Sequence, residues 1–386
     1  VHREHALALL NPERPIIGTG YEAEFGHNSS SYIKADADYK VVAKIPKFSS
    51  RPGYHYWVIL QKLETGEIHV IERISYKHIT EVYGYNYNNS VLDEITTGQY
   101  IGEGDVIKKS TSFDEFNNRM DGVNLITAYL ASDVTMEDGI ILSESAASKF
   151  DVPLFKKVQV IVNENDILLN LYGDNDTYKT FPNIGEHVQQ GMVCAIRRQK
   201  KEESLFTQSY NRLRDIMMSD DKFTTEGEVI DINIYCNNPE NLETNYYNSQ
   251  LKYYYDEHLK FCQGIVNTIE PFVKKNRLSY EAQKLYYPCR NVLDKKQYIK
   301  DKPFNNIIID IIIMERNRIN KGDKLSNRYG GKGVVSEIRP DHLMPIGVDS
   351  GRRYDVISSQ FSPGARKTFD VNMDMLANAF MAKEND

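Results

Sequence analysis

The spacing of apolar and polar residues predicts a β-rich region near the start of the chain. Short apolar runs at 41–45, 56–60 and 67–71 are separated by turn residues, and their length and composition are typical of strands. The segment 63–67 contains a glycine and suits a hairpin turn between the second and third runs.

Further along, helical and strand-like patterns follow one another. The segments 203–219 and 242–269 carry apolar residues at roughly helical spacing, and 228–235 has the composition of a strand. The run 307–314 is almost continuously apolar and rich in isoleucine, which predicts a strand that is buried on both faces. This strand leads directly into a segment rich in glycine and lysine, 321–333.

One short pattern occurs three times, at 100–107, 185–193 and 318–325. It consists of an apolar residue, two mostly polar residues, glycine, one or two further residues and an apolar residue. We interpret it as a strand, a tight turn with positive φ at the glycine, and a returning strand. Such hairpins are common in small β-barrels and carry no functional information of their own.

Composition indicates a globular chain of two or three packing units. It has 386 residues, of which 41% are hydrophobic, and no apolar run reaches the ~18 residues that a membrane helix needs. The cysteines do not form a C-x-x-C pair, which argues against a zinc ribbon and predicts reduced, mostly buried thiols. They are Cys194, Cys236, Cys262 and Cys289.

The net charge of -7 argues against a protein that coats nucleic acid through its overall charge, but it allows a local basic site. The segment from Glu315 to Arg339 is a candidate for such a site, because it contains seven basic and only three acidic residues. Glycines in this segment allow close approach of a ligand, and Lys324 and Lys332 could place two positive charges near phosphate oxygens. The alternative is a solvated basic hairpin.

Two other segments carry candidate chemistry. Glu137 and Asp138 lie between two strand-like runs; they form either a plain turn or a site in which one carboxylate faces a metal-bound nucleotide through water. Near the end of the chain, a Pro-Gly turn precedes Arg366 and Lys367, which could meet a phosphate or lie at the surface.

Taken in order, these segments resemble the β subunit of bacterial RNA polymerase. The hairpin matches the family pattern G-D-K-x-x-x-R-x-G-x-K-G, although Tyr329 and Gly331 replace the family's His and Asn. Arg366 aligns with the arginine of the family's N-P-L-G-V-P-S-R-M-N stretch. Further matches follow in the family's order at 13–20, 122–129, 136–144 and 212–232.

The resemblance implies a mostly β fold with inserted helices (α+β). A double-psi β-barrel would carry an inserted flap or wall domain and small β-barrel modules. Residues 1–118 would form a β-rich external or connector region. Residues 119–150 and 307–386 would together form the barrel that binds hybrid and nucleotide, and 151–306 would form the flap- or wall-like insertion.

The resemblance also implies roles at the catalytic centre of a DNA-directed RNA polymerase. Lys324 and Lys332 would contact the RNA 3′ end and the phosphates of the incoming nucleotide. Nucleotide binding would fall to Arg366, Glu137 and Asp138, and nucleic-acid binding to Arg328 and Lys321. No residue would ligate metal directly, although Asp138 could reach Mg²⁺ through water, because the D-x-D-x-D loop belongs to the family's other large subunit.

The implied partners are β′-like subunit chains, a separate N-terminal β fragment, a promoter-specificity factor, DNA template, RNA and nucleoside triphosphates, without a membrane. The chain would be the C-terminal half of a split β subunit, as in giant bacteriophage polymerases, located in the cytoplasm of the infected host or in the virion. The alternatives are a non-catalytic module that keeps the β-subunit fold and binds nucleic acid or a partner, and an unrelated β-rich interaction protein.

Overall fold

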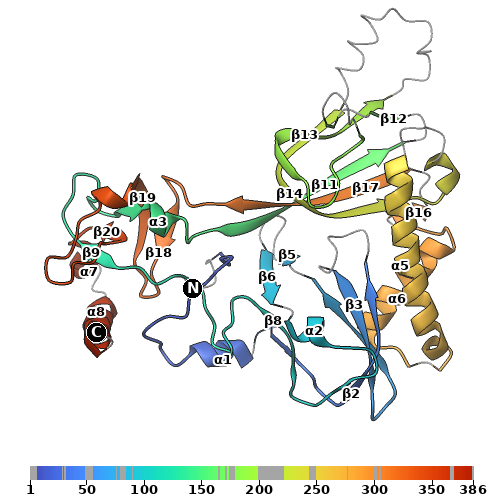
Figure 1. Ribbon diagram of the computed structural model, residues 1–386, viewed down its shortest axis with the longest axis horizontal. Coiled ribbons are helices and arrows are strands. Elements are labelled where there is room, and N and C mark those ends of the chain that lie inside the picture. Colours follow the sequence, from blue (N-terminus) through green and yellow to red (C-terminus); the bar gives the residue numbers. More distant parts are fainter. Residues whose placement is uncertain are drawn as a thin grey trace, which may run out of the picture.

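Figure 1 shows the computed structural model, in which strands from distant parts of the sequence are combined into several sheets. The structure describes residues 7–27, 29, 32–47, 55–74, 76–78, 84–88, 90–163, 166–169, 172–173, 179–198, 221–242, 249–275, 277–299, 302–303, 306–365 and 369–384. The predicted helix at 203–219 and Arg366 lie outside these residues.

The N-terminal sheet confirms the strands that the apolar pattern predicts. Its strand order is β4-β3-β2-β7. The members are β2 (Tyr39–Pro46), β3 (Tyr56–Lys62), β4 (Ile68–Arg73) and β7 (Tyr100–Ile101). The predicted hairpin turn connects β3 to the antiparallel β4, and Gly66 in this turn has φ 69°, a conformation that glycine adopts without steric cost.

Alternate residues of β3 pack into two different hydrophobic cores, because successive side chains of a strand point to opposite faces of the sheet. Val58 and Leu60 pack with Leu92 of α2 (Ser90–Glu94) on one face of the sheet. Ile59 packs on the other face with the helices α5 (Ser249–Val273) and α6 (Tyr280–Leu293).

The helix α5 confirms the apolar stripe predicted in 242–269, whereas α6 was not predicted. Its sequence nevertheless carries the signal, because Ser279 caps the helix by accepting a hydrogen bond from the amide of Ala282 at 3.2 Å. Buried residues then recur at helical spacing. They are Ala282, Leu285, Tyr286, Cys289 and Val292.

The central sheet has the order β11-β17-β14-β13-β12, and its middle part holds the strand predicted to be buried on both faces. This strand, β17 (Ile307–Asn317), pairs antiparallel with a strand on either side, and Ile309, Ile311 and Ile313 are fully buried. The other members are β11 (Val152–Val162), β12 (Asp166–Leu169), β13 (His187–Arg198) and β14 (Asp221–Tyr235). β14 contains the predicted strand 228–235.

A second lobe contains the basic hairpin, and the long strands β11 and β17 connect it to the central sheet (Figure 1). Its sheet has the order β18-β19-β10-β20-β9. The members are β9 (Thr127–Tyr129), β10 (Gly139–Ser143), β18 (Lys324–Ser326), β19 (Lys332–Arg339) and β20 (Val356–Ser358). Two pairs are parallel, β10 with β19 and β20 with β9, so segments far apart in sequence interleave. We call this unit the hairpin lobe.

The remaining elements are short or lie at the edges of these sheets. A further sheet has the order β1-β8-β6-β5, with β1 (Tyr32–Lys34), β5 (Tyr76–His78), β6 (Gly84–Asn88) and β8 (Val106–Ser110). The strand β15 (Tyr298–Ile299) pairs with β16 (Lys302–Pro303). The helices are α1 (Glu22–His27), α3 (Glu144–Ala147), α7 (Ser362–Ala365) and α8 (Phe369–Glu384).

The fold is mixed α+β and sheet-rich, as predicted. The double-psi form of the barrel and the division into 1–118, 119–150 with 307–386, and 151–306 stay predictions. β17 is relevant to the last boundary. Residues 307–317 pair with β11 along their whole length and 308–314 pair also with β14, in the sheet of the inserted segment.

The repeated glycine pattern gives turns at two of its three positions. Gly104 and Gly322 have φ 89° and 97°, as the interpretation requires. The prediction of a turn at Gly191 is wrong, because β13 continues from His187 to Arg198 and its pairing with β14 shifts register on both sides of this residue. Gly191 therefore lies within a strand, at an irregularity in its pairing with β14.

The predicted burial of the cysteines is confirmed for Cys236, Cys262 and Cys289, which are buried and free. The side chain of Cys194 lies outside the described part. In the portion of the chain that the structure describes, none of the helices has the length and apolar character needed to cross a membrane.

Candidate functional site

The β18–β19 hairpin presents its two predicted lysines on one face. The strands pair antiparallel with Ser326 opposite Lys332 and Lys324 opposite Val334. Directly opposed residues share a face, and so do residues two apart in a strand. The ammonium groups of Lys324 and Lys332 therefore project from the same side of the hairpin, and both residues are exposed.

The turn of this hairpin is fixed by Asn327, a residue that the sequence reasoning missed. Its side-chain oxygen accepts hydrogen bonds from the amides of Tyr329 at 3.0 Å and Gly331 at 2.8 Å, and its own amide donates to the carbonyl of Gly331 at 2.9 Å. Asparagine commonly closes turns in this way. An asparagine shortly before the glycine pair at 330–331 could therefore have indicated the turn from the sequence. The result is a defined tip directly before Lys332.

The carboxylate pair at 137–138 lies beside this hairpin, in a turn at the start of β10. Glu137 has φ 59°, a conformation that non-glycine residues seldom adopt, and both acidic residues are exposed. The local structure is a turn, and the predicted role of the two carboxylates at a nucleotide stays a prediction. The carbonyl oxygen of Asp138 accepts a hydrogen bond from the amide of Val334 at 2.9 Å, which joins this turn to the hairpin.

A glycine makes this close approach possible. A Cβ on Gly333 would lie 2.4 Å from the carbonyl oxygen of Asp138 and 2.6 Å from Cδ1 of Ile140. No larger side chain fits without movement of the backbone or of Ile140. The glycine after Lys332 therefore serves strand packing, and the same packing brings the acidic turn next to the lysine.

A cavity of about 1190 Å³ opens between the hairpin, the sheet and α8. Lys332, Asp138 and Arg328 are among its lining residues, together with Tyr129 of β9 and Asp374 of α8. Lys324, Lys321 and Glu137 do not line it. The structure thus places Lys332, Asp138 and Arg328 around one cavity, whereas Lys324 lies on the same hairpin face as Lys332 but does not line the cavity.

Arg328 lies at the hairpin tip in a largely buried setting. Its side chain is 21% exposed, and its guanidinium donates a hydrogen bond to Asp374 at 3.2 Å and stacks over the ring of Tyr329, 5.3 Å from the centroid. Burial raises the pKa of Tyr329, and a hydrogen bond to the Asp374 carboxylate adds to the effect.

Lys321 has a different setting from the other basic residues. It is exposed and directly precedes Gly322, in the turn that leads into β18. The amide of Gly322 donates to the carbonyl of Val335 at 2.8 Å, which ties this turn back to β19.

The N-terminal loop that matches the family between residues 13 and 20 contacts the same lobe. Asn124 donates from its side chain to the carbonyl of Arg14 at 2.8 Å, and its amide donates to the carboxylate of Glu13 at 2.8 Å. Lys149 also donates to Glu13, at 3.1 Å. Burial acts to raise the pKa of Glu13, but the hydrogen bonds from the Asn124 amide and from Lys149 together lower it. Two of the predicted collinear matches are therefore in direct contact.

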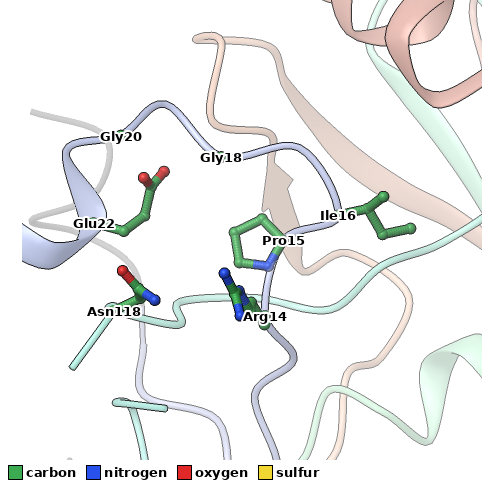
Figure 2. A pocket seen from close by; sticks show the side chains of 7 residues that line it. All are labelled: Arg14, Pro15, Ile16, Gly18, Gly20, Glu22 and Asn118. Atoms are coloured by element: carbon green, nitrogen blue, oxygen red, sulfur yellow. The ribbon is translucent and has the colours of Figure 1, made fainter. Parts of the chain in front are cut away.

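A smaller cavity of about 410 Å³ lies along this loop (Figure 2). Glu22 directs its carboxylate toward the chain between Gly18 and Gly20, and it accepts hydrogen bonds from the amide of Thr19 at 2.9 Å and from its hydroxyl at 2.8 Å. Glu22 is only 5% exposed. The loop is thus closed by a buried carboxylate that also lies 4.0 Å from the guanidinium of Arg328.

These residues do not form a metal site by themselves. Within the described ranges, there is no group of three or more His, Cys, Asp or Glu side chains arranged to hold a metal ion. Asp138 lines the cavity and Glu137 does not, and both carboxylates are exposed. Such an arrangement does not fit a directly ligated Mg²⁺, which takes near-octahedral oxygen coordination.

A known protein-family model matches most of this chain. The family model described as "RNA polymerase Rpb2, domain 6" matches residues 61–385, which include β10, the hairpin and α8. The chain belongs to this RNA polymerase family. The predicted resemblance to the β subunit is thereby confirmed at the level of the family, whereas the split form and the bacteriophage origin stay predictions.

Curated relatives agree with the family assignment. The chain is 24% identical over 382 residues to proteins named "DNA-directed RNA polymerase subunit beta" from Streptococcus suis (strain 05ZYH33) and Streptococcus pneumoniae (strain ATCC 700669 / Spain 23F-1). It is 23% identical over 381 residues to the protein of the same name from Streptococcus uberis. Each alignment covers 97% of this chain but only 27% of the relative, so the chain spans about a quarter of the length of these β subunits.

Proposed function

We propose that this chain is part of the β subunit of a multisubunit DNA-directed RNA polymerase, where it contacts the incoming nucleotide, the RNA 3′ end and the RNA–DNA hybrid during nucleotidyl transfer. One observation carries the proposal: the hairpin displays Lys324 and Lys332 on one face, and Lys332 shares a cavity with Asp138. A family member with two ammonium groups at such a site is suited to hold phosphates.

In this proposal the two lysines supply electrostatic stabilisation. Nucleotidyl transfer places negative charge on phosphate oxygens, and fixed positive groups at that place lower the barrier because they need no reorganisation during the reaction. Lys332, at the cavity, contacts the phosphates of the nucleotide, and Lys324, further along the same face, contacts the RNA 3′ end. The hydrogen-bonded turn at Asn327 keeps their spacing fixed.

Other residues of the proposed site have supporting roles. Asp138 lies near the nucleotide and reaches a Mg²⁺ ion only through water, and Glu137 lies beside it. Arg366 contacts the triphosphate, and Lys321 and Arg328 contact nucleic acid. In this proposal, the Mg²⁺ that the chemistry requires is held mainly by a β′-like partner chain.

The proposed partners are β′-like chains, a separate N-terminal β fragment and a promoter-specificity factor, together with template, RNA and nucleotides. Three exposed phenylalanines at 361 and on α8 could contact such partners. Phe361, Phe369 and Phe380 are 72%, 78% and 71% exposed. The double-psi barrel, the split subunit, and a bacteriophage polymerase made in the host cytoplasm or carried in the virion belong to the same proposal.

The test is to purify the full chain from its native source together with the chains bound to it. The proposal expects a co-purifying chain with a D-x-D-x-D loop and template-dependent RNA synthesis by the assembly. An assembly that binds nucleic acid but makes no RNA would favour the non-catalytic module instead. Purification without any polymerase chain would contradict the proposal.

A further inference from the structure

Three segments that are distant in sequence meet at the guanidinium of Arg328. The hairpin supplies the arginine, α8 supplies Asp374 at 3.2 Å, and α1 supplies Glu22 at 4.0 Å. Asp374 and Glu22 therefore lie around one cation. An arginine that serves only as a phosphate contact would not need two carboxylates beside it.

The setting of these groups makes their interaction stronger than that of a surface pair. The side chains of Arg328, Asp374 and Glu22 are 21%, 23% and 7% exposed. Solvent screens charges less effectively at such sites than at the surface. The Nη1 atom of Arg328 is buried and has no hydrogen-bond partner among the described residues. It is the atom that lies 4.0 Å from Glu22, so the contact with α1 is an ion pair without a hydrogen bond, whereas Nη2 donates a hydrogen bond to Asp374.

The position of Arg328 in the chain links this cluster to the proposed catalytic lysine. It lies in the hairpin turn between Asn327, whose side chain closes that turn, and Lys332, which begins β19. Movement of the tip would therefore move the lysine. The planar guanidinium can engage groups on two sides, whereas a lysine ammonium acts as a point charge.

We infer that Arg328 is a positioning residue that bridges α8 and α1 and thereby holds Lys332 at the cavity. This inference rests on the proposed function, because the bridge affects nucleotide addition only through the position of Lys332. At Arg328, the bridge takes the place of the contact with nucleic acid proposed above, and the other proposed roles are unchanged. In the bridge, Asp374 and Arg328 act as one unit; in a direct contact, Arg328 acts alone and a phosphate replaces the Asp374 carboxylate.

A double-mutant cycle in the co-purified assembly separates these two roles. The variants are Arg328→Gln, Asp374→Asn and both together, with Asp370→Asn, an exposed residue of the same helix, as matched control. The measurements are kcat and KM for single-nucleotide addition and the salt dependence of template binding. Residues that act as a unit give non-additive effects.

The bridge predicts that each single variant slows addition by about tenfold or more, because small displacements of a catalytic group are costly. The double variant should be no slower than either single variant, Asp374→Glu should restore part of the rate, and the salt dependence should not change. Asp370→Asn should behave as wild type. Since Asp374→Asn preserves side-chain shape, it remains informative if Arg328→Gln fails to fold.

Two results would overturn the bridge. In the first, the double variant slows nucleotide addition by the product of the factors found for the two single variants. In the second, Arg328→Gln lowers the slope of template affinity against salt concentration by about one phosphate contact, while Asp374→Asn leaves the rate of addition unchanged.

Hydrogen exchange of the hairpin amides in the full chain keeps this test apart from the proposed function. If Lys332→Ala does not alter addition but both single variants expose the hairpin amides equally, the proposed function fails and the bridge stands. If Lys332→Ala slows addition but the amides and the rate do not respond to Asp374→Asn, the bridge fails and the function stands.

Discussion

The carbonyl oxygen of Asp138 accepts the amide hydrogen of Val334 at 2.9 Å, and this contact joins two segments that the sequence separates widely. It is part of the parallel pairing of β10 with β19. Gly333 permits it because it has no side chain. The acidic turn and the lysine hairpin are thus one packed unit.

The first prediction concerns Gly333→Ala. The new methyl carbon would lie 2.4 Å from a backbone oxygen, which cannot move without disturbing β10. We expect a loss of about 1–3 kcal/mol in the free energy of unfolding, the range for overpacked sites. Urea denaturation of the full chain measures it.

Gly122→Ala is the matched control for this stability measurement. A Cβ on Gly122 would meet no atom within 4 Å, so the unfolding midpoint should stay close to wild type. Equal destabilisation by the two substitutions would show that the close approach at Gly333 is not the cause.

The second prediction concerns the ion pair between Lys47 and Asp231, which joins the N-terminal sheet to β14. Their side chains are 9% and 5% exposed, and the charged atoms are 2.7 Å apart. Lys47→Met would leave a buried carboxylate without its cation, which should lower the free energy of unfolding by about 3–5 kcal/mol. Chemical denaturation gives the value.

The double variant Lys47→Met/Asp231→Leu tests the cause of this loss. Since it removes the carboxylate as well, it should recover most of the stability. A double variant that is less stable than Lys47→Met would indicate that the pair is needed for packing rather than for charge balance.

The third prediction concerns acid sensitivity of the hairpin lobe. The Ser145 amide donates to the Asp341 carboxylate at 3.0 Å and holds the pKa of Asp341 below its usual range. The stabilising contribution is therefore complete above the unfolded pKa of about 3.9 and is lost as the pH falls through the lower folded pKa.

The comparison of wild type with Asp341→Asn tests this sign. The difference between their urea midpoints should be constant from about pH 5 to 7 and should shrink as the pH falls below about 4. A difference that grows toward low pH would contradict the assignment.

Local patterns were sufficient to predict several elements. The β-branched run at 307–314 specified a buried strand because few other environments accept so many isoleucines, and the spacing in 242–269 specified the buried face of α5. The resemblance to the polymerase family identified Lys324 and Lys332 as candidate site residues. Their common face then followed from the hairpin register, which the sequence alone did not provide.

Long-range relationships could not be predicted from the sequence. Nothing near Arg328 in the chain indicates Glu22 or Asp374 as neighbours, since both arrive through the packing of distant segments. Gly191 shows the limit of local reasoning in a different way. Glycine suits both a turn and a bulge, and only the pairing of β13 with β14 decides between them.

Single-nucleotide addition at saturating nucleotide tests most directly whether Lys324 and Lys332 act in nucleotidyl transfer. The measurement uses the assembly that carries Lys324→Ala and Lys332→Ala, with Lys284→Ala on α6 as the control for loss of charge elsewhere. Removal of preorganised charge from the reacting phosphates should slow addition by about 100-fold or more, with the control unchanged. An unchanged rate in the assembled double variant would contradict the account.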